Sequence, residues 1–101
     1  QYLSVAENSL SGSIPETLDT LDKLEELRLH GNRLTGAVPS ELGRLRYLQS
    51  LSLHGNSLQG QIPTQLGNLS ALQYLWISSN NFTGGVPSEL GRLHKLRYLW
   101  F

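Results

Sequence analysis

The chain has 101 residues, of which 39% are hydrophobic and 16% are charged, and this is enough for one small domain with a modest core. It contains no Cys and no Met, so disulfide bonds and thiolate-held metals are excluded. Eight basic residues balance eight acidic ones, and a formal net charge of +0 lacks the basic footprint of a nucleic-acid-binding protein. No apolar stretch approaches the roughly 18 residues of a membrane span, so we expect no membrane contact by this segment.

Several residue types recur every 24 positions along the whole chain. The recurring polar and turn-forming residues are Asn8, Asn32, Asn56 and Asn80; Gly12, Gly36, Gly60 and Gly84; and Pro15, Pro39, Pro63 and Pro87. The apolar positions keep the same spacing, as in Leu3, Leu27, Leu51, Leu75 and Leu99. Such a period indicates a repeat architecture in which each repeat packs against its neighbours. The sequence therefore predicts one domain over residues 1–101, made of about four 24-residue repeats.

Each repeat should begin with a short strand, as in the stretch from Leu27 to His30. Apolar and polar residues alternate there, so Leu27 and Leu29 should point into the core. The strand should end at Asn32, whose amide can donate to and accept from turn backbone that would otherwise be buried without partners. Because this asparagine recurs in every repeat, we expect a ladder of Asn8, Asn32, Asn56 and Asn80.

The second half of each repeat should bend and return through a short helical turn. In the unit at residues 24–47, Gly36 suits a bend with a positive φ, and Pro39 suits the first turn of a helix. Gly43 is placed to end that helix after about one or two turns. The first repeat has Asp19 at the position of Gly43, so its helix is expected to close differently.

One coil of this kind cannot bury its leucine face alone, so successive coils must stack at about 4.8 Å per strand. We therefore predict a fold of the α/β class that is dominated by β structure. It should be a right-handed solenoid with a concave parallel sheet of about five short strands and a convex side of short helical turns.

The repeat LxxLxLxxNxLxGxIPxxLGxL resembles that of the plant-specific leucine-rich-repeat family over the whole chain. This family is found in the ectodomains of receptor-like kinases, in receptor-like proteins and in polygalacturonase-inhibiting proteins. The resemblance implies a leucine-rich-repeat solenoid that recognises other molecules outside the cell or at its surface, with a cytoplasmic location as the alternative. Family members usually carry Cys-bearing caps, and both ends of this chain lack them, so we expect a fragment of a longer array or an engineered piece.

Ligand contacts should lie on the outward positions of the concave sheet, where neighbouring strands place side chains in columns. Aromatic residues gather near the C-terminal end of two columns, as Tyr74, Trp76, Tyr98 and Trp100. Tyr and Trp are enriched at binding hot spots, so we predict that these four residues contact a protein or peptide ligand. The alternative is that the rings stack for stability alone, which contributes about 0.5–1.5 kcal/mol per pair without any ligand.

Arg28, His30 and His54 are further candidate ligand contacts, because their side chains could orient a polar partner. His30 and His54 share a column, but a zinc site needs three or four ligands and no third is evident, so we expect a solvated pair and no metal. Ser52, His30 and Glu26 superficially resemble a hydrolytic triad. An open, regular sheet offers neither a strained nucleophile elbow nor an oxyanion hole, so we predict that the chain is not an enzyme.

The sequence thus predicts a recognition module without a cofactor, whose ligand is a protein or peptide, with a glycan as the further option and nucleic acid excluded. The second functional class is a scaffold that self-associates head to tail, because acidic residues gather early in the chain and Arg92, Lys95 and Arg97 lie late. Asn68 and Asn81 each begin an Asn-x-Ser/Thr sequence, so both are candidate glycosylation sites, which favours secretion.

Overall fold

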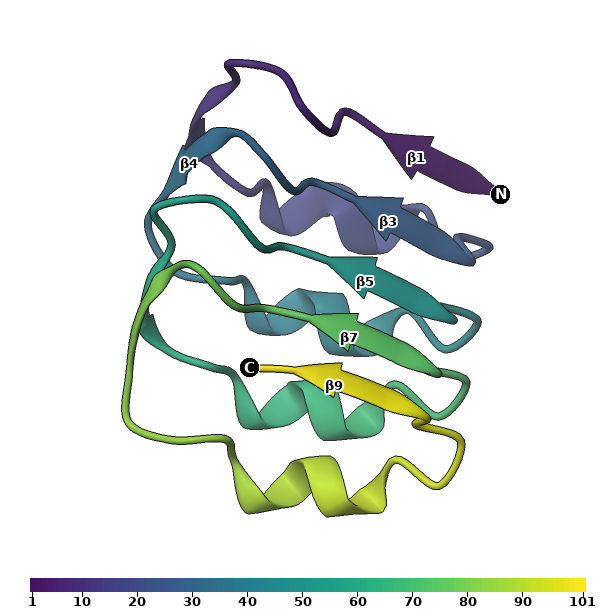
Figure 1. Cartoon of the computed structure of the whole chain (residues 1–101). Coiled ribbons are helices and arrows are strands. Elements are labelled where there is room, and N and C mark those ends of the chain that lie inside the picture. The colour runs from purple at the N-terminus through teal and green to yellow at the C-terminus, as the bar shows by residue number, and fades with distance from the viewer.

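A computed structural model describes all residues, 1–101, as a stack of similar coils that ends in one further strand (Figure 1). Each coil contributes a first strand, a second strand and a short 3-10 helix, in that order. The first strands are β1 (Tyr2–Ser4), β3 (Glu26–Arg28), β5 (Ser50–Ser52), β7 (Tyr74–Trp76) and β9 (Tyr98–Trp100). The second strands are β2 (Ser11–Ser13), β4 (Arg33–Thr35), β6 (Gln59–Gln61) and β8 (Asn81–Thr83). The helices are η1 (Glu16–Thr20), η2 (Ser40–Arg44), η3 (Thr64–Asn68) and η4 (Ser88–Arg92).

The first strands form one parallel sheet in the order β1-β3-β5-β7-β9. Each strand pairs with the next in a constant register, in which Leu27 lies between Leu3 and Leu51. Figure 1 shows these strands side by side along one face of the stack, with the helices along the opposite face. The predicted solenoid, with its concave parallel sheet of five strands and its convex helical turns, is confirmed.

The second strands form two smaller parallel sheets, β2 with β4 and β6 with β8, which the repeat pattern does not predict. Segments such as Ser11–Ser13 and Gln59–Gln61 are polar with a central Gly, so they lack the apolar alternation that marks a half-buried strand. They pair because stacking places them side by side, in a register in which Gly12 lies opposite Leu34 and Gly60 opposite Phe82. Gly36 has a φ of 77°, as predicted for the bend.

Leucine side chains with almost no solvent exposure make up the core. Leu27, Leu51 and Leu75 point inward from the concave strands, Leu42 reaches the same cluster from η2, and all four are 0% exposed. Burial of one such side chain contributes about 1.5–3 kcal/mol. The end coils are less protected, because Leu99 has a neighbouring coil on one side only and is 40% exposed.

Asn56 shows how the recurring asparagine joins two coils. Its Nδ2 donates to the backbone carbonyl oxygens of Leu29 and Leu53, at 3.0 Å each. Its Oδ1 accepts a hydrogen bond from the backbone N–H of Leu34 at 3.0 Å. Leu29 and Leu34 belong to the preceding coil and Leu53 to the coil of Asn56 itself. The buried amide therefore ends its own strand and also holds the preceding coil in place.

The other asparagines extend this arrangement along the stack. Asn32 and Asn80 bond both their own coil and the preceding one in the same way. Asn8 lies in the first coil, where its exposed amide donates to the carbonyl oxygens of Val5 and Ala6. Asn32, Asn56 and Asn80 thus bridge successive coils, while Asn8 bonds only within its own coil.

The recurring proline was expected in the first turn of each helix, but each helix begins one residue after it. Pro39 precedes η2 with an extended backbone, at φ −67° and ψ 134°. Its carbonyl oxygen accepts from the backbone N–H of Leu42 at 3.2 Å, which opens the first turn. The fixed φ of proline therefore serves the approach to the helix rather than its first residue.

The prediction that Gly43 ends its helix is wrong, because Gly43 lies inside η2, is buried and has no positive φ. A Cβ at Gly43 would overlap the backbone carbonyl oxygen of Gln65 in the next coil. A Cβ at Gly67 would likewise lie 2.5 Å from the carbonyl oxygen of Glu89. Glycine at this position therefore lets two neighbouring helices approach closely.

The expectation that the first helix closes differently is also wrong. η1 ends as the other helices do, with the backbone N–H of Leu21 donating to the carbonyl oxygen of Leu18. Asp19 occupies the glycine position, and its Oδ2 accepts from Nη1 of Arg44 on η2 at 2.8 Å. Between η1 and η2 an ion pair therefore replaces the close glycine contact that Gly43 and Gly67 make with the next helix.

We predict that Gly43→Ala lowers the free energy of unfolding by about 1–3 kcal/mol, because the added methyl group overpacks the contact between η2 and η3. Gly91→Ala is the matched control, since Gly91 has the same position in the last coil and no atom lies within 4 Å of an added Cβ. Its effect should stay within about 0.5 kcal/mol. Urea unfolding followed by circular dichroism measures both, and equal losses would contradict the packing role.

Candidate functional site

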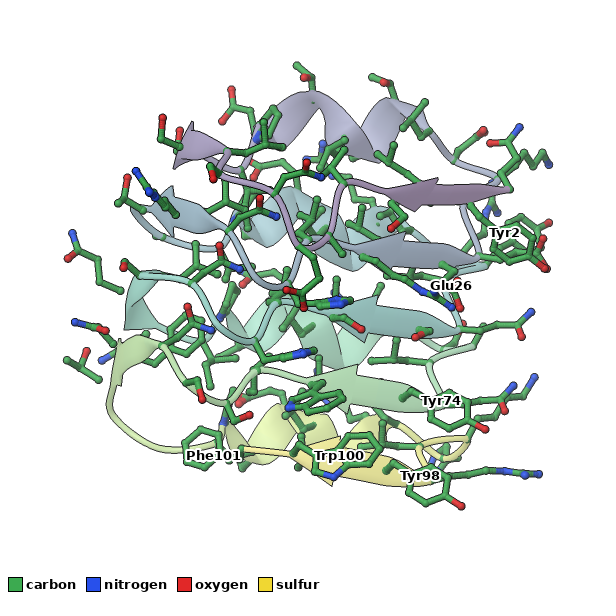
Figure 2. All side chains as sticks on the ribbon, turned by 45° about the horizontal axis from the view of Figure 1, so that its top comes forward. Tyr2, Glu26, Tyr74, Tyr98, Trp100 and Phe101 are labelled. Atoms are coloured by element: carbon green, nitrogen blue, oxygen red, sulfur yellow. The ribbon has the colours of Figure 1, made fainter.

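The concave sheet presents its outward side chains in straight columns. Backbone register pairs Tyr2 with Glu26, and Tyr74 with Tyr98, with Ser50 between the two pairs. Figure 2 shows Tyr2, Glu26, Tyr74 and Tyr98 following one another along one edge of the sheet. The second column consists of Ser4, Arg28, Ser52, Trp76 and Trp100.

The aromatic patch consists of Tyr74, Trp76, Tyr98 and Trp100 on β7 and β9. Ring centroids are 5.2 Å apart between Tyr74 and Tyr98, and 5.1 Å apart between Trp76 and Trp100. Tyr98 and Trp100 are stacked at 5.5 Å. The four side chains remain 38% to 49% exposed, although they contact one another. The register of two neighbouring strands therefore builds a continuous aromatic surface that is open to solvent.

Two histidines continue this series of rings toward the N-terminal end. His30 and His54 are stacked at 4.4 Å, and His54 is stacked on Trp76 at 3.7 Å. The indole Nε1 of Trp76 donates to Oγ of Ser78 at 2.7 Å, which holds the indole toward the histidine column. The expectation of a solvated histidine pair is wrong, because both rings are half-buried and both Nδ1 atoms are buried without a hydrogen-bond partner. The neighbouring column positions are visible in the sequence, but the lean of Trp76 toward His54 is not.

Glu7 lies beside the histidines, with its Oε1 3.8 Å from Nε2 of His30. Its backbone has a φ of 55°, whereas the equivalent positions in the next two coils are Gly31 and Gly55. Burial is the main cause that lowers the pKa of His54 below the usual 6.5, and the nearby charge of a protonated His30 adds to it. The Glu7 carboxylate opposes the shift. At neutral pH the ring of His54 is therefore uncharged.

Two pockets lie on the concave sheet, and both include Ser50 and Tyr74. The aromatic pocket, of about 480 Å³, includes Arg28, His30, Ser50, Ser52, His54, Tyr74, Trp76 and Trp100. The acidic pocket, of about 360 Å³, is lined by Tyr2, Glu25, Glu26, Gln49, Ser50 and Tyr74. The predicted ligand contacts thus all line the aromatic pocket except Tyr98, which adjoins it by stacking on Tyr74 and Trp100.

Arg28 is already engaged within the chain, because its Nη2 lies 2.8 Å from Oε2 of Glu26. The prediction from sequence did not include Glu7, Glu25, Glu26, Ser50 or Ser52 among the binding residues. The sequence could have pointed to Ser50 and Ser52, because both are small where the neighbouring repeats carry larger residues.

Other candidate features lie apart from this surface. Asn68 ends η3 and Asn81 begins β8, and both are exposed on elements outside the concave sheet. No group of three or more His, Cys, Asp or Glu side chains is arranged to hold a metal ion. Each helix of the structure has five residues, which is too short to span a lipid bilayer.

We predict that His54 titrates with a midpoint below 6.5 in an NMR pH titration. His30→Gln should raise the midpoint, because it removes a neighbouring positive charge, and Glu7→Gln should lower it further. The unfolded chain binds the proton more readily, so the contribution of His54 to the free energy of unfolding is present above pH 6.5 and decreases as the pH falls below that value. A midpoint at or above 6.5, or one that neither substitution changes, would contradict these causes of the pKa shift.

Two family models together match almost the whole chain. One leucine rich repeat model matches residues 46–100, and another matches residues 1–21 and 23–45. A search of curated proteins gave no match.

Several solved structures from plants are similar to the chain. The Arabidopsis receptor kinase HAESA, in complex with the peptide hormone IDA and the co-receptor SERK1, is 44% identical with a TM-score of 0.96, over 98% of this chain and 17% of that chain. The BIR3–SERK2 complex from Arabidopsis thaliana is 43% identical with a TM-score of 0.91, over 96% of this chain and 52% of that chain. A plant ice-binding protein is 37% identical with a TM-score of 0.88, over 92% of this chain and 30% of that chain.

The chain spans about half the length of the matched BIR3–SERK2 chain and less of the other two. The family models and these neighbours agree with the repeat seen in the sequence and with the solenoid seen in the structure. The chain belongs to the leucine-rich-repeat family, and its repeats are of the plant type.

Proposed function

We propose that the chain is an extracellular recognition module that binds a protein or peptide ligand on its concave face. The observation that carries the proposal is the aromatic patch, in which four Tyr and Trp side chains stay 38% to 49% exposed on an open sheet. Contiguous exposed apolar surface of this kind marks an interaction site, and Tyr and Trp supply large contact areas at a small cost in side-chain entropy.

The four rings of the patch are proposed to make the main ligand contacts. Arg28, His30 and His54 border the same surface and are proposed to orient polar groups of the ligand. Stacking alone explains why rings occupy neighbouring strands, but rings that served only stability would gain more from burial than this open face allows. A glycan is the other ligand class that suits exposed aromatic rings.

The similar structures support a recognition function but no single class of ligand. HAESA was solved in complex with a peptide hormone and a co-receptor, and the matched 17% of its chain has the same fold as this chain and 44% sequence identity. The ice-binding protein has the same fold, so the fold does not decide the ligand. We propose an extracellular location because HAESA is a receptor kinase. Glycans at Asn68 and Asn81 would lie off the concave sheet and leave it open.

Head-to-tail self-association is the second candidate, and the observation that favours it is the division of charge along the stack. Glu16 and Asp22 lie in the first coil, whereas Arg92 and Lys95 lie in the last. The acidic residues contribute less to the end surfaces than their early position suggests. Glu26 belongs to the second coil and is paired with Arg28, while Asp19 is paired with Arg44.

We predict that Trp76→Ala weakens ligand binding at least tenfold, because truncating a hot-spot side chain typically costs more than about 1.4 kcal/mol. Peptide clones selected from a random displayed library against the native chain serve as the probe, and their binding to each variant is measured by biolayer interferometry. Tyr47→Ala is the matched control, since Tyr47 is an exposed aromatic residue that contacts Lys23 and lies outside the patch. Clones that bind Trp76→Ala as well as the native chain would refute the proposal.

We predict for the recognition module a constant monomeric mass in light scattering over a wide range of protein concentration and salt. A mass that grows with concentration would support the self-associating scaffold, and suppression of that growth by salt would identify charge as its cause. Glu16→Lys and Asp22→Lys then probe the end of the first coil, where Glu16 belongs to η1.

A further inference from the structure

The acidic pocket and the aromatic pocket join into one groove along β5. Ser50 and Tyr74 line both pockets, and Ser52 continues the floor of the aromatic pocket. The groove exists because β5 carries two small serines where the flanking strands β3 and β7 carry large side chains. Two strand spacings separate β3 from β7, so the backbones that carry the walls lie about 10 Å apart, which is the spacing of two strands that flank one extended chain in a sheet. Glu26 and Tyr74, labelled in Figure 2, stand on opposite walls.

The acidic pocket has the chemistry of a site for a cationic side chain. Its lining contains two carboxylates and two tyrosine rings, and no cationic side chain. Glu25 is engaged within the chain, because it accepts from the backbone nitrogen of Gln1 at 2.9 Å and from Nε2 of Gln49 at 3.2 Å. Glu26 has only its Oε2 in an ion pair, with Arg28 at 2.8 Å.

A carboxylate offers about four acceptor positions, so Glu26 can accept from a second cation. The ring of Tyr74 lies on the opposite wall, where it can add a cation–π contact to the same group. An ammonium or guanidinium group between Glu26 and Tyr74 would therefore meet opposite charge on one side and an aromatic ring on the other.

The aromatic pocket differs in chemistry. Its walls are the rings of His30, His54, Trp76 and Trp100, and its charged groups, Glu7 and Arg28, have opposite signs. His54 is uncharged at neutral pH, because burial and His30 lower its pKa. This pocket therefore suits an uncharged ring, either an aromatic side chain or a prolyl ring.

The distance between the two pockets along the groove matches the geometry of an extended peptide. The floor residues Ser50 and Ser52 are two positions apart on one strand, which corresponds to about 6.6 Å. Side chains two positions apart on an extended ligand point the same way with the same spacing. We propose that the groove binds an extended peptide in which a Lys or Arg lies two positions from an aromatic or prolyl residue, with the basic side chain in the acidic pocket and the ring in the aromatic pocket. This inference rests on the proposed function and specifies its ligand.

An acidic ligand fits the groove less well. Arg28 is the one cationic side chain on its walls, and it is already paired with Glu26. A carboxylate brought to Arg28 would lie close to Glu26 and Glu7, so charge repulsion would offset the attraction. The groove therefore selects for a positive charge.

The test uses the intact chain and four acetylated, amidated pentapeptides, titrated while the indole N–H signals of Trp76 and Trp100 are followed by NMR. The lead peptide is Gly-Arg-Ala-Trp-Gly. Two peptides replace its Arg by Ala or by Glu, and the fourth, Gly-Ala-Arg-Trp-Gly, keeps the composition but places Arg next to Trp. We expect the dissociation constant to rise roughly tenfold for the Glu peptide and about threefold to fivefold for the Ala and adjacent peptides.

Glu26→Gln should abolish the preference for Arg over Ala, and it should improve binding of the Glu peptide because Arg28 is released from its partner. Glu16→Gln is the matched control on η1, outside the groove, and should leave all four affinities unchanged.

Two outcomes would overturn the inference. If the Arg, Ala and Glu peptides bind equally and all lose affinity to Trp76→Ala, the cation site is wrong while recognition by the aromatic patch stands. If no peptide shifts either indole signal at millimolar concentration, the groove does not bind this class of peptide, and the library selection with Trp76→Ala decides the proposed function separately.

Discussion

The asparagine that follows β3, β5 and β7 makes the hydrogen bonds on which the stack of coils depends. Asn56 satisfies carbonyl oxygens in two coils and accepts a backbone N–H from the preceding one, so strand ends and coil spacing are held by one side chain. Without it, several buried backbone groups would lose their partners at a cost of about 1–3 kcal/mol each. The leucines supply most of the stabilising burial, but they are interchangeable in shape and do not by themselves specify where one coil ends.

The constant register between concave strands places equivalent residues of successive repeats in columns on one surface. Residues 24 apart become neighbours on adjacent strands, so a column can be varied without disturbing the buried positions. Rings in two adjacent columns produce an aromatic patch, and serines at two positions of β5 produce a groove. The neighbouring histidines show that columns also interact, because Trp76 stacks on His54 rather than standing alone. Binding properties in this fold therefore arise from combinations of outward residues, and the fold itself favours no ligand.

Much of the fold could be predicted because the same residue types recur at equivalent positions of every repeat. The concave strands, the bends at Gly36 and its equivalents, and the outward columns all followed from periodicity and elementary backbone preferences. The candidate patch could be predicted for the same reason. What failed was the role of Gly43, since a glycine in a short turn suggests a helix end, and its true role depends on the carbonyl oxygen of Gln65 in another coil. The small second sheets were not predicted either, because β2 and β6 carry no strand pattern and pair only once the coils are stacked.

The sequence by itself determined the period, the inward leucines and which side chains face outward, because each of these follows from local alternation repeated at a constant interval. Only the tertiary structure decided how close neighbouring coils come, which outward rings touch, and which carboxylates stay available. Glu25 and Glu26 are adjacent in sequence and alike in chemistry, yet contacts from Gln1 and Gln49 occupy both oxygens of Glu25, while only one oxygen of Glu26 is paired. These differences arise between coils, where distances depend on the packing of whole repeats and no local pattern records them.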